Sequence, residues 1–86
     1  MALTQHQITR AATLVAGPDS LRAAAAQLRA EFAGLPTSVV DATDMRDEAP
    51  ALRIGDRAIY LARSDGHCWT VTTDPAHADA IVLAQA

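Results

Sequence analysis

The stretch Ile59-Tyr-Leu-Ala-Arg-Ser-Asp-Gly-His-Cys-Trp-Thr-Val-Thr72 predicts a β-hairpin. Two runs rich in β-branched, aromatic and apolar residues flank Asp65-Gly66, a dipeptide that is frequent in hairpin turns. The stretch also contains the only cysteine, the only tryptophan and the only tyrosine of the chain. We therefore expect this hairpin to organise the sheet and to lie near any chemistry that the protein performs.

The hydrophobic pattern distinguishes two registers for the hairpin. A two-residue turn at Asp65-Gly66 would mix apolar and polar side chains on each face. A three-residue loop, Ser64-Asp65-Gly66 with a glycine bulge, separates them. We predict the second register, because a one-residue slip turns every side chain to the opposite face. Its core face carries Ile59, Leu61, Trp69 and Val71, and its outer face carries Tyr60, Ala62, Cys68, Thr70 and Thr72.

Two amphipathic helices are predicted before the hairpin. Thr4 and Gln7 have capping-box spacing, and the helix that they begin is stopped by Gly17-Pro18. Asp19 or Ser20 caps the second helix. The two helices are expected to form an antiparallel pair.

Short strands follow these helices. The further segments predicted as strands are 37–41, 52–54 and 80–84. The chain is thus expected to be a single α+β domain, residues 1–86, with the two N-terminal helices packed on one face of a four- or five-stranded, mainly antiparallel sheet. The other face of the sheet would be partly open.

Composition excludes several classes of function. All seven basic residues are arginines, so Schiff-base chemistry and a phosphate-loop lysine are excluded. The net charge of −3, with dispersed arginines, argues against nucleic-acid binding. One cysteine cannot form an intramolecular disulfide, and no apolar run is long enough for a membrane span. We expect a cytoplasmic protein without a cofactor, which binds neither nucleic acid nor a membrane.

The segment 41–48 is the only dense acidic run of the chain. It lacks the alternating oxygen ligands, central glycine and terminal glutamate of a calcium-binding loop. It predicts a solvated loop or a short helix capped by Asp44. The alternative is an acidic surface for an arginine-rich partner.

His67 and Cys68 are the residues of the hairpin best suited to bind a metal ion or to act in catalysis. As strand neighbours they would point to opposite faces, which disfavours a shared metal ion. His77 and Asp79 follow in the next turn, so the alternative metal set is His67, Cys68, His77 and Asp79. A nucleophilic Cys68 would need His77 as its base.

Several short motifs resemble a small proteobacterial family of unknown function whose members occur near nitrogen-fixation genes. The motifs are Tyr60-Leu61, His67-Cys68-Trp69, Thr72 or Thr73 with Asp74-Pro75-Ala76, and Val82-Leu83-Ala84. The resemblance covers about half of the chain, mainly residues 44–84. It implies an accessory role in a nitrogen-fixing bacterium, and it implies no catalytic residues.

Two hypotheses about function follow from these features. The first is a small non-catalytic accessory or protein-interaction domain that uses the sheet face carrying Tyr60, Cys68 and Thr70. A homodimer formed through that face or through an edge strand extends this hypothesis. The second is a metal- or thiol-dependent protein centred on Cys68 with His67 or His77.

Overall fold

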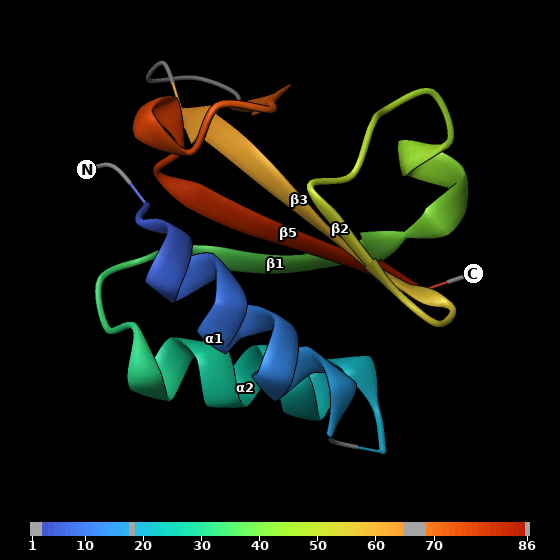
Figure 1. The fold of residues 1–86 in the computed structure, drawn as a ribbon. Helices are drawn as coiled ribbons and strands as arrows, with labels where there is room; N and C mark the ends of the chain where they lie inside the picture. The colour runs from blue at the N-terminus through green and yellow to red at the C-terminus, as the bar shows by residue number, and fades with distance from the viewer. Residues whose placement is uncertain (1–2, 18, 65–68, 86) are drawn as a thin grey trace.

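Two helices lie side by side against one face of a five-stranded mixed sheet in the computed structural model, which describes residues 3–17, 19–64 and 69–85 (Figure 1). In chain order the elements are α1 (Gln5–Ala16), α2 (Leu21–Glu31), β1 (Thr37–Asp41), the 3₁₀ helix η1 (Ala42–Met45), β2 (Leu52–Ile54), β3 (Arg57–Ser64), β4 (Trp69–Thr72), the 3₁₀ helix η2 (Pro75–His77) and β5 (Ala80–Gln85). The predicted α+β class, with both helices on one sheet face, is confirmed.

The helices begin where the sequence places their caps. The Thr4 hydroxyl accepts a hydrogen bond from the Gln7 N–H at 3.1 Å, and the Gln7 side chain accepts one from the Thr4 N–H at 2.8 Å. Ser20, rather than Asp19, caps α2 by accepting from the Ala23 N–H at 3.1 Å. These bonds satisfy main-chain donors that have no partner within the helix.

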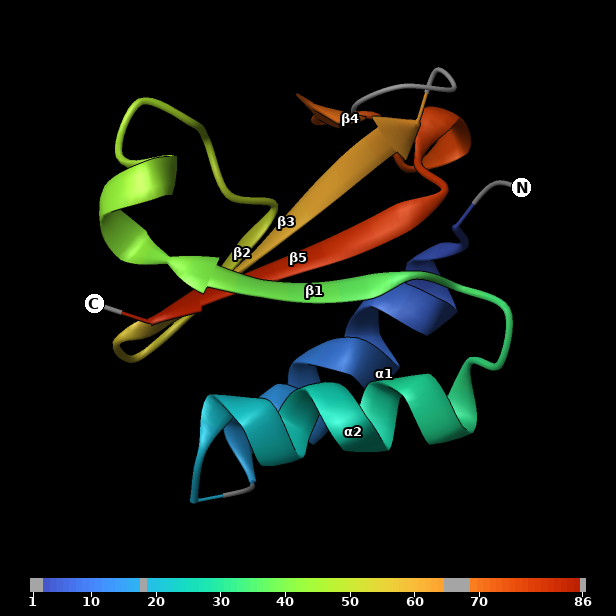
Figure 2. The ribbon, with the colours of Figure 1, turned by 180° about the vertical axis from the view of Figure 1, so that it is seen from behind.

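The sheet has the strand order β1-β5-β3, and both β2 and β4 pair with the remaining edge of β3. β2 pairs with the first part of β3, and β4 pairs with the part from Leu61 to Ser64. β1 runs parallel to β5, whereas the other pairings are antiparallel. One edge of the sheet is therefore divided between two short strands, and the other edge is β1 alone (Figure 2).

The structure has two hydrophobic cores, one on each face of the sheet. The helix-side core joins α1 and α2 to inward-facing residues of the sheet, among them Ile59, Leu61 and Leu83. The opposite core consists of Met45, Ala58, Tyr60, Ala62, Ala80, Val82 and Ala84, with Val40 and Val71 packed against it. The expectation of a partly open second face is wrong for the centre of that face, because the segment that crosses from β1 to β2 places Met45 over it.

The register of β3 and β4 differs from the predicted one. Leu61 pairs with Thr72 and Ala62 pairs with Val71, whereas the predicted three-residue loop at 64–66 would set Leu61 opposite Trp69. Ser64 pairs with Trp69, so residues 65–68 connect the strands. The predicted bulge at Gly66 lies outside the described residues. The observed register turns the side chain of Val71 toward the second core, which contains Tyr60. The two registers differ because this sheet accommodates apolar side chains on both of its faces.

The segment 42–51 forms the outer layer of the second core. Its short helix is capped by Asp41, whose Oδ1 accepts from the Thr43 N–H at 3.3 Å, and not by Asp44 as predicted. Met45 is its buried residue. None of the helices in the described ranges is long and apolar enough to cross a membrane.

Candidate functional site

The sequence-predicted interaction residues do not form one open surface. Tyr60 is only 4% exposed and packs within the second core. Thr70 is exposed and pairs with Arg63, whereas the predicted three-residue loop would set it opposite Tyr60. Cys68 lies outside the described residues. The burial of Tyr60 removes the central side chain of the predicted docking face.

The residues of the alternative metal set are only partly described, since His67 and Cys68 lie outside the described residues. His77 Nε2 lies 3.8 Å from Asp74 Oδ2, and both side chains are more than half exposed. The Asp79 N–H donates to the Ala62 carbonyl at 2.9 Å, which ties this turn to β3. Within residues 3–17, 19–64 and 69–85, no three histidine, cysteine, aspartate or glutamate side chains are placed to share a metal ion.

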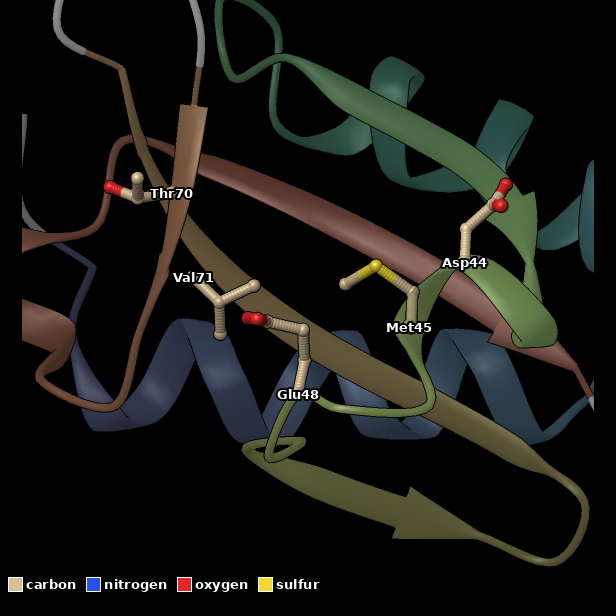
Figure 3. A pocket seen from close by; sticks show the side chains of 5 residues that line it. All are labelled: Asp44, Met45, Glu48, Thr70 and Val71. Carbon is tan, nitrogen blue, oxygen red and sulfur yellow. The ribbon is translucent and has the colours of Figure 1, made fainter.

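A cleft of about 450 Å³ lies between η1 and β4 (Figure 3). Met45 and Val71 provide its apolar wall, and Asp44, Glu48 and Thr70 complete the lining. The Glu48 carboxylate is directed toward Val71, whereas the Asp44 carboxylate points away from Val71. Two carboxylates that diverge in this way do not supply converging ligands for a single cation.

A second cleft, of about 390 Å³, lies beside the N-terminal part of α1 on the other face of the sheet. It is lined by Gln5, Ile8, Pro50, Ala51, Leu52, Leu61, Thr73 and Pro75. No ionisable side chain belongs to this lining among the described residues. The cleft therefore provides no general acid or base for catalysis.

The outer edge of β1 is the longer of the sheet edges with unused pairing capacity among the described strands. The Pro36 carbonyl accepts from the Ile81 N–H at 2.9 Å, so it points toward β5. Successive peptide groups of a strand point to opposite edges, which directs the main-chain groups of Thr37, Val39 and Asp41 outward. The position of Arg29 agrees, since its Nε and Nη2 donate to the Thr37 carbonyl at 3.2 and 2.8 Å.

Val39 lies at the middle of this edge. Its side chain is 42% exposed, and it is the one large hydrophobic residue with that degree of exposure in the described part of the chain. The strand has five residues and contains no proline or lysine, two residues that commonly protect edge strands from pairing. At the opposite edge, β2 and β4 have only three and four residues. β1 is thus the edge best suited to accept another strand.

The chain matches no protein-family model, no curated protein and no solved structure.

The sequence did not identify the edge of β1 as a candidate site. Thr37-Ser-Val-Val-Asp41 predicts a strand, but the pattern of a strand does not state which neighbours it has. A usable signal was the unbroken apolar run at the end of the chain, residues 80–84, which is typical of a strand buried on both faces. Such a central strand requires neighbours on both sides, and β1 proves to be one of them.

Proposed function

We propose that this protein is a small non-catalytic interaction domain that takes up a strand of a protein partner along the outer edge of β1. The observation that supports this proposal is the exposed Val39 at the centre of an edge with which no other described strand pairs. Addition of a strand to an exposed sheet edge is a recurrent way of binding an extended segment. The two clefts are weaker candidates for a ligand-binding site than the β1 edge is for strand addition, because neither cleft brings together converging polar groups.

The chemistry of the edge defines the partner segment. The N–H and carbonyl of Val39 point outward and would exchange hydrogen bonds with one residue of an antiparallel strand. The side chain of that residue would lie against Val39, so an aliphatic β-branched residue fits best. Main-chain bonds provide affinity that is largely independent of sequence, and contact with Val39 provides selectivity.

An accessory role in a nitrogen-fixing bacterium belongs to the same proposal. It rests on the resemblance of the motifs between residues 44 and 84. An interaction domain is compatible with such a role, since an accessory protein acts through its partner. Genomic neighbourhood in the source organism tests this part separately from the site.

Photo-crosslinking in the source organism tests the site. The photoreactive amino acid p-benzoylphenylalanine replaces Ser38, which is exposed on β1. We expect discrete adducts whose protein components are identified by mass spectrometry. A second substitution, Val39→Pro, removes the outward N–H without removing a hydrogen bond to β5, and should abolish the adducts.

The matched control places the same photoreactive residue at Arg53, which is exposed on β2 at the opposite edge. Adducts formed equally from positions 38 and 53 would contradict the proposal. So would adducts from position 38 that survive Val39→Pro in a protein with an unchanged circular dichroism spectrum.

A further inference from the structure

We propose that the strand taken up by β1 is β1 of a second copy of this chain, paired antiparallel about a two-fold axis at Val39. This inference rests on the proposed function and names the partner. A two-fold interface brings the same surface of both subunits together, so that surface must be complementary to itself. The edge of β1 meets this requirement in its main chain, its apolar side chain and its charges.

The main-chain geometry allows the pairing. With Val39 opposite Val39 of the partner subunit, Thr37 stands opposite Asp41 of the partner subunit. All three positions direct their N–H and carbonyl groups outward, so they coincide with the hydrogen-bonded positions of an antiparallel ladder. The Thr37 carbonyl already accepts from both Nε and Nη2 of Arg29, so the ladder consists of the bonds between the two Val39 residues and the bond from the Thr37 N–H to the Asp41 carbonyl of the partner subunit.

The charges of the edge are also self-complementary. Arg29 is exposed and its guanidinium is held at Thr37, whereas Asp41 is exposed at the other end of the same strand. The two-fold arrangement therefore places Arg29 beside Asp41 of the partner subunit, and repeats this contact by symmetry. Within the described residues neither Arg29 nor Asp41 has an intrachain ion pair. Asp41 Oδ1 accepts from the Thr43 N–H at 3.3 Å, which leaves Oδ2 for the guanidinium of the partner subunit.

The contacts lie on one side of the joined sheets. Thr37 and Val39 pair with Ile81 and Leu83 of β5, both of which belong to the helix-side core. The side chains of alternate residues share a face, so Asp41 follows Thr37 and Val39 onto this side. Figure 2 shows α2, which bears Arg29, in the layer beneath β1. The Val39 pair would thus be flanked on each side by an arginine and an aspartate.

Charge reversal tests the contact between Arg29 and Asp41 of the partner subunit. A variant that dimerises weakly because its structure is damaged would not recover its affinity when it is mixed with the other variant. Arg29→Glu places two acidic side chains at each contact, and Asp41→Arg places two basic ones there. In an equimolar mixture of these variants, each contact pairs one acidic with one basic side chain. Sedimentation equilibrium over a range of concentrations measures the dimer dissociation constant of the parent, of each variant and of the mixture.

We expect each variant alone to dimerise at least about tenfold more weakly than the parent, and the mixture to form a heterodimer within about threefold of the parent affinity. The matched controls are Arg22→Glu on α2 and Asp47→Arg after η1, two exposed positions away from the β1 edge. These controls make the same changes of charge, and they should leave the dissociation constant unchanged.

Val39→Asp provides a second test that leaves the arginine and aspartate in place. It brings two carboxylates together at the axis, and it should weaken the dimer at least as much as the charge reversals do. Its exposed position should let the variant fold, which circular dichroism verifies.

The outcomes separate this inference from the proposed function. A parent that stays monomeric at all concentrations, or a dimer that no substitution at position 29, 39 or 41 weakens, overturns the second copy as the partner. If crosslinks from position 38 then join a different protein and are lost in Val39→Pro, the strand-accepting edge still stands. If those crosslinks also fail, both proposals are overturned.

Discussion

Arg29 on α2 holds the main-chain carbonyl of Thr37 on β1 through two hydrogen bonds, of 3.2 Å from Nε and 2.8 Å from Nη2. The carbonyl points to the outer edge of the sheet, where no strand is paired with it among the described residues. One side chain therefore attaches the helical layer to the sheet and satisfies a main-chain group of the edge strand.

Replacement of Arg29 by alanine should lower the free energy of unfolding by about 1–2 kcal/mol, because the Thr37 carbonyl loses charge-assisted hydrogen bonds. Urea unfolding at a low protein concentration measures the change apart from any association. Arg22→Ala, at an exposed position of the same helix, is the control and should change the free energy by less than about 0.5 kcal/mol. Equal losses in the two variants would show that the contact contributes nothing specific.

Met45→Ala should destabilise the protein by about 2–5 kcal/mol, as expected for truncation of a buried methionine. Met45 is 3% exposed and covers the core that contains Tyr60 and Val82. The control is Val39→Ala at the exposed edge, with a loss below about 1 kcal/mol. A Met45→Ala protein as stable as its parent would show that the second face is not sealed by this segment.

The turn between β2 and β3 requires a residue with positive φ. Gly55 has a φ of 60° and joins the paired residues Ile54 and Arg57 together with Asp56. An added Cβ would meet no atom within 4 Å, so the cost of a substitution is backbone strain rather than a clash. We expect Gly55→Ala to cost about 1–2 kcal/mol in thermal or urea unfolding.

Chirality provides the control for this turn. D-alanine at position 55, introduced by chemical synthesis, accepts positive φ without that strain and should be at least as stable as glycine. Similar losses for the two enantiomers would contradict the observed conformation of Gly55.

The ion pair between the helices should make a small contribution that depends on pH. Arg10 Nε and Nη2 donate to the Glu31 carboxylate at 2.7 and 3.0 Å, and this hydrogen bonding is the main reason that the pKa of Glu31 is lowered. A carboxyl group with a lower pKa in the folded state stabilises the protein above its unfolded pKa, near 4.3, and loses that contribution as the pH falls through the folded value.

Glu31→Gln removes this titration. The difference in unfolding midpoint between the parent and Glu31→Gln should therefore be largest near neutral pH and should shrink below about pH 4. The effect should be modest because the pair is solvent-exposed, and it should weaken further in salt. A difference that grows toward acid pH would reverse the assigned direction of the shift.

The register of β4 can be tested by adding a charge. Thr70 stands opposite Arg63, and both are exposed. Thr70→Glu should gain about 0.2–1 kcal/mol from this cross-strand pair. In an Arg63→Ala background the same substitution should gain nothing, so a double-mutant cycle isolates the pair. A zero coupling energy would favour a different register, such as one that places Thr70 opposite Tyr60.

The features that depend on neighbouring residues could be predicted from the sequence. Thr4 and Ser20 cap helices through bonds to main-chain groups three residues away. The strand at residues 37–41 has the predicted limits. Gly55-Asp56, a dipeptide typical of turns, joins β2 to β3. Local hydrogen bonds and steric limits on φ decide these features, and both are encoded within a few residues.

The face to which β4 turns was decided by the tertiary structure. Val71 could be buried against Ile59 or against Tyr60, and hydrophobicity alone does not distinguish two buried faces. Only the arrival of Met45 from the segment between β1 and β2 creates the second core that Val71 joins.

The candidate site depends on the tertiary structure in the same way. The sequence determined that Val39 lies in a strand, because β-branched residues in a short run favour one. The pairing of β1 with β5 decided that this strand is an edge, because β5 bonds only the main-chain groups on one side of β1. Arg29 reached the Thr37 carbonyl only once α2 had packed beneath β1. An edge is a relation between distant segments, so long-range packing decides it and the local sequence does not.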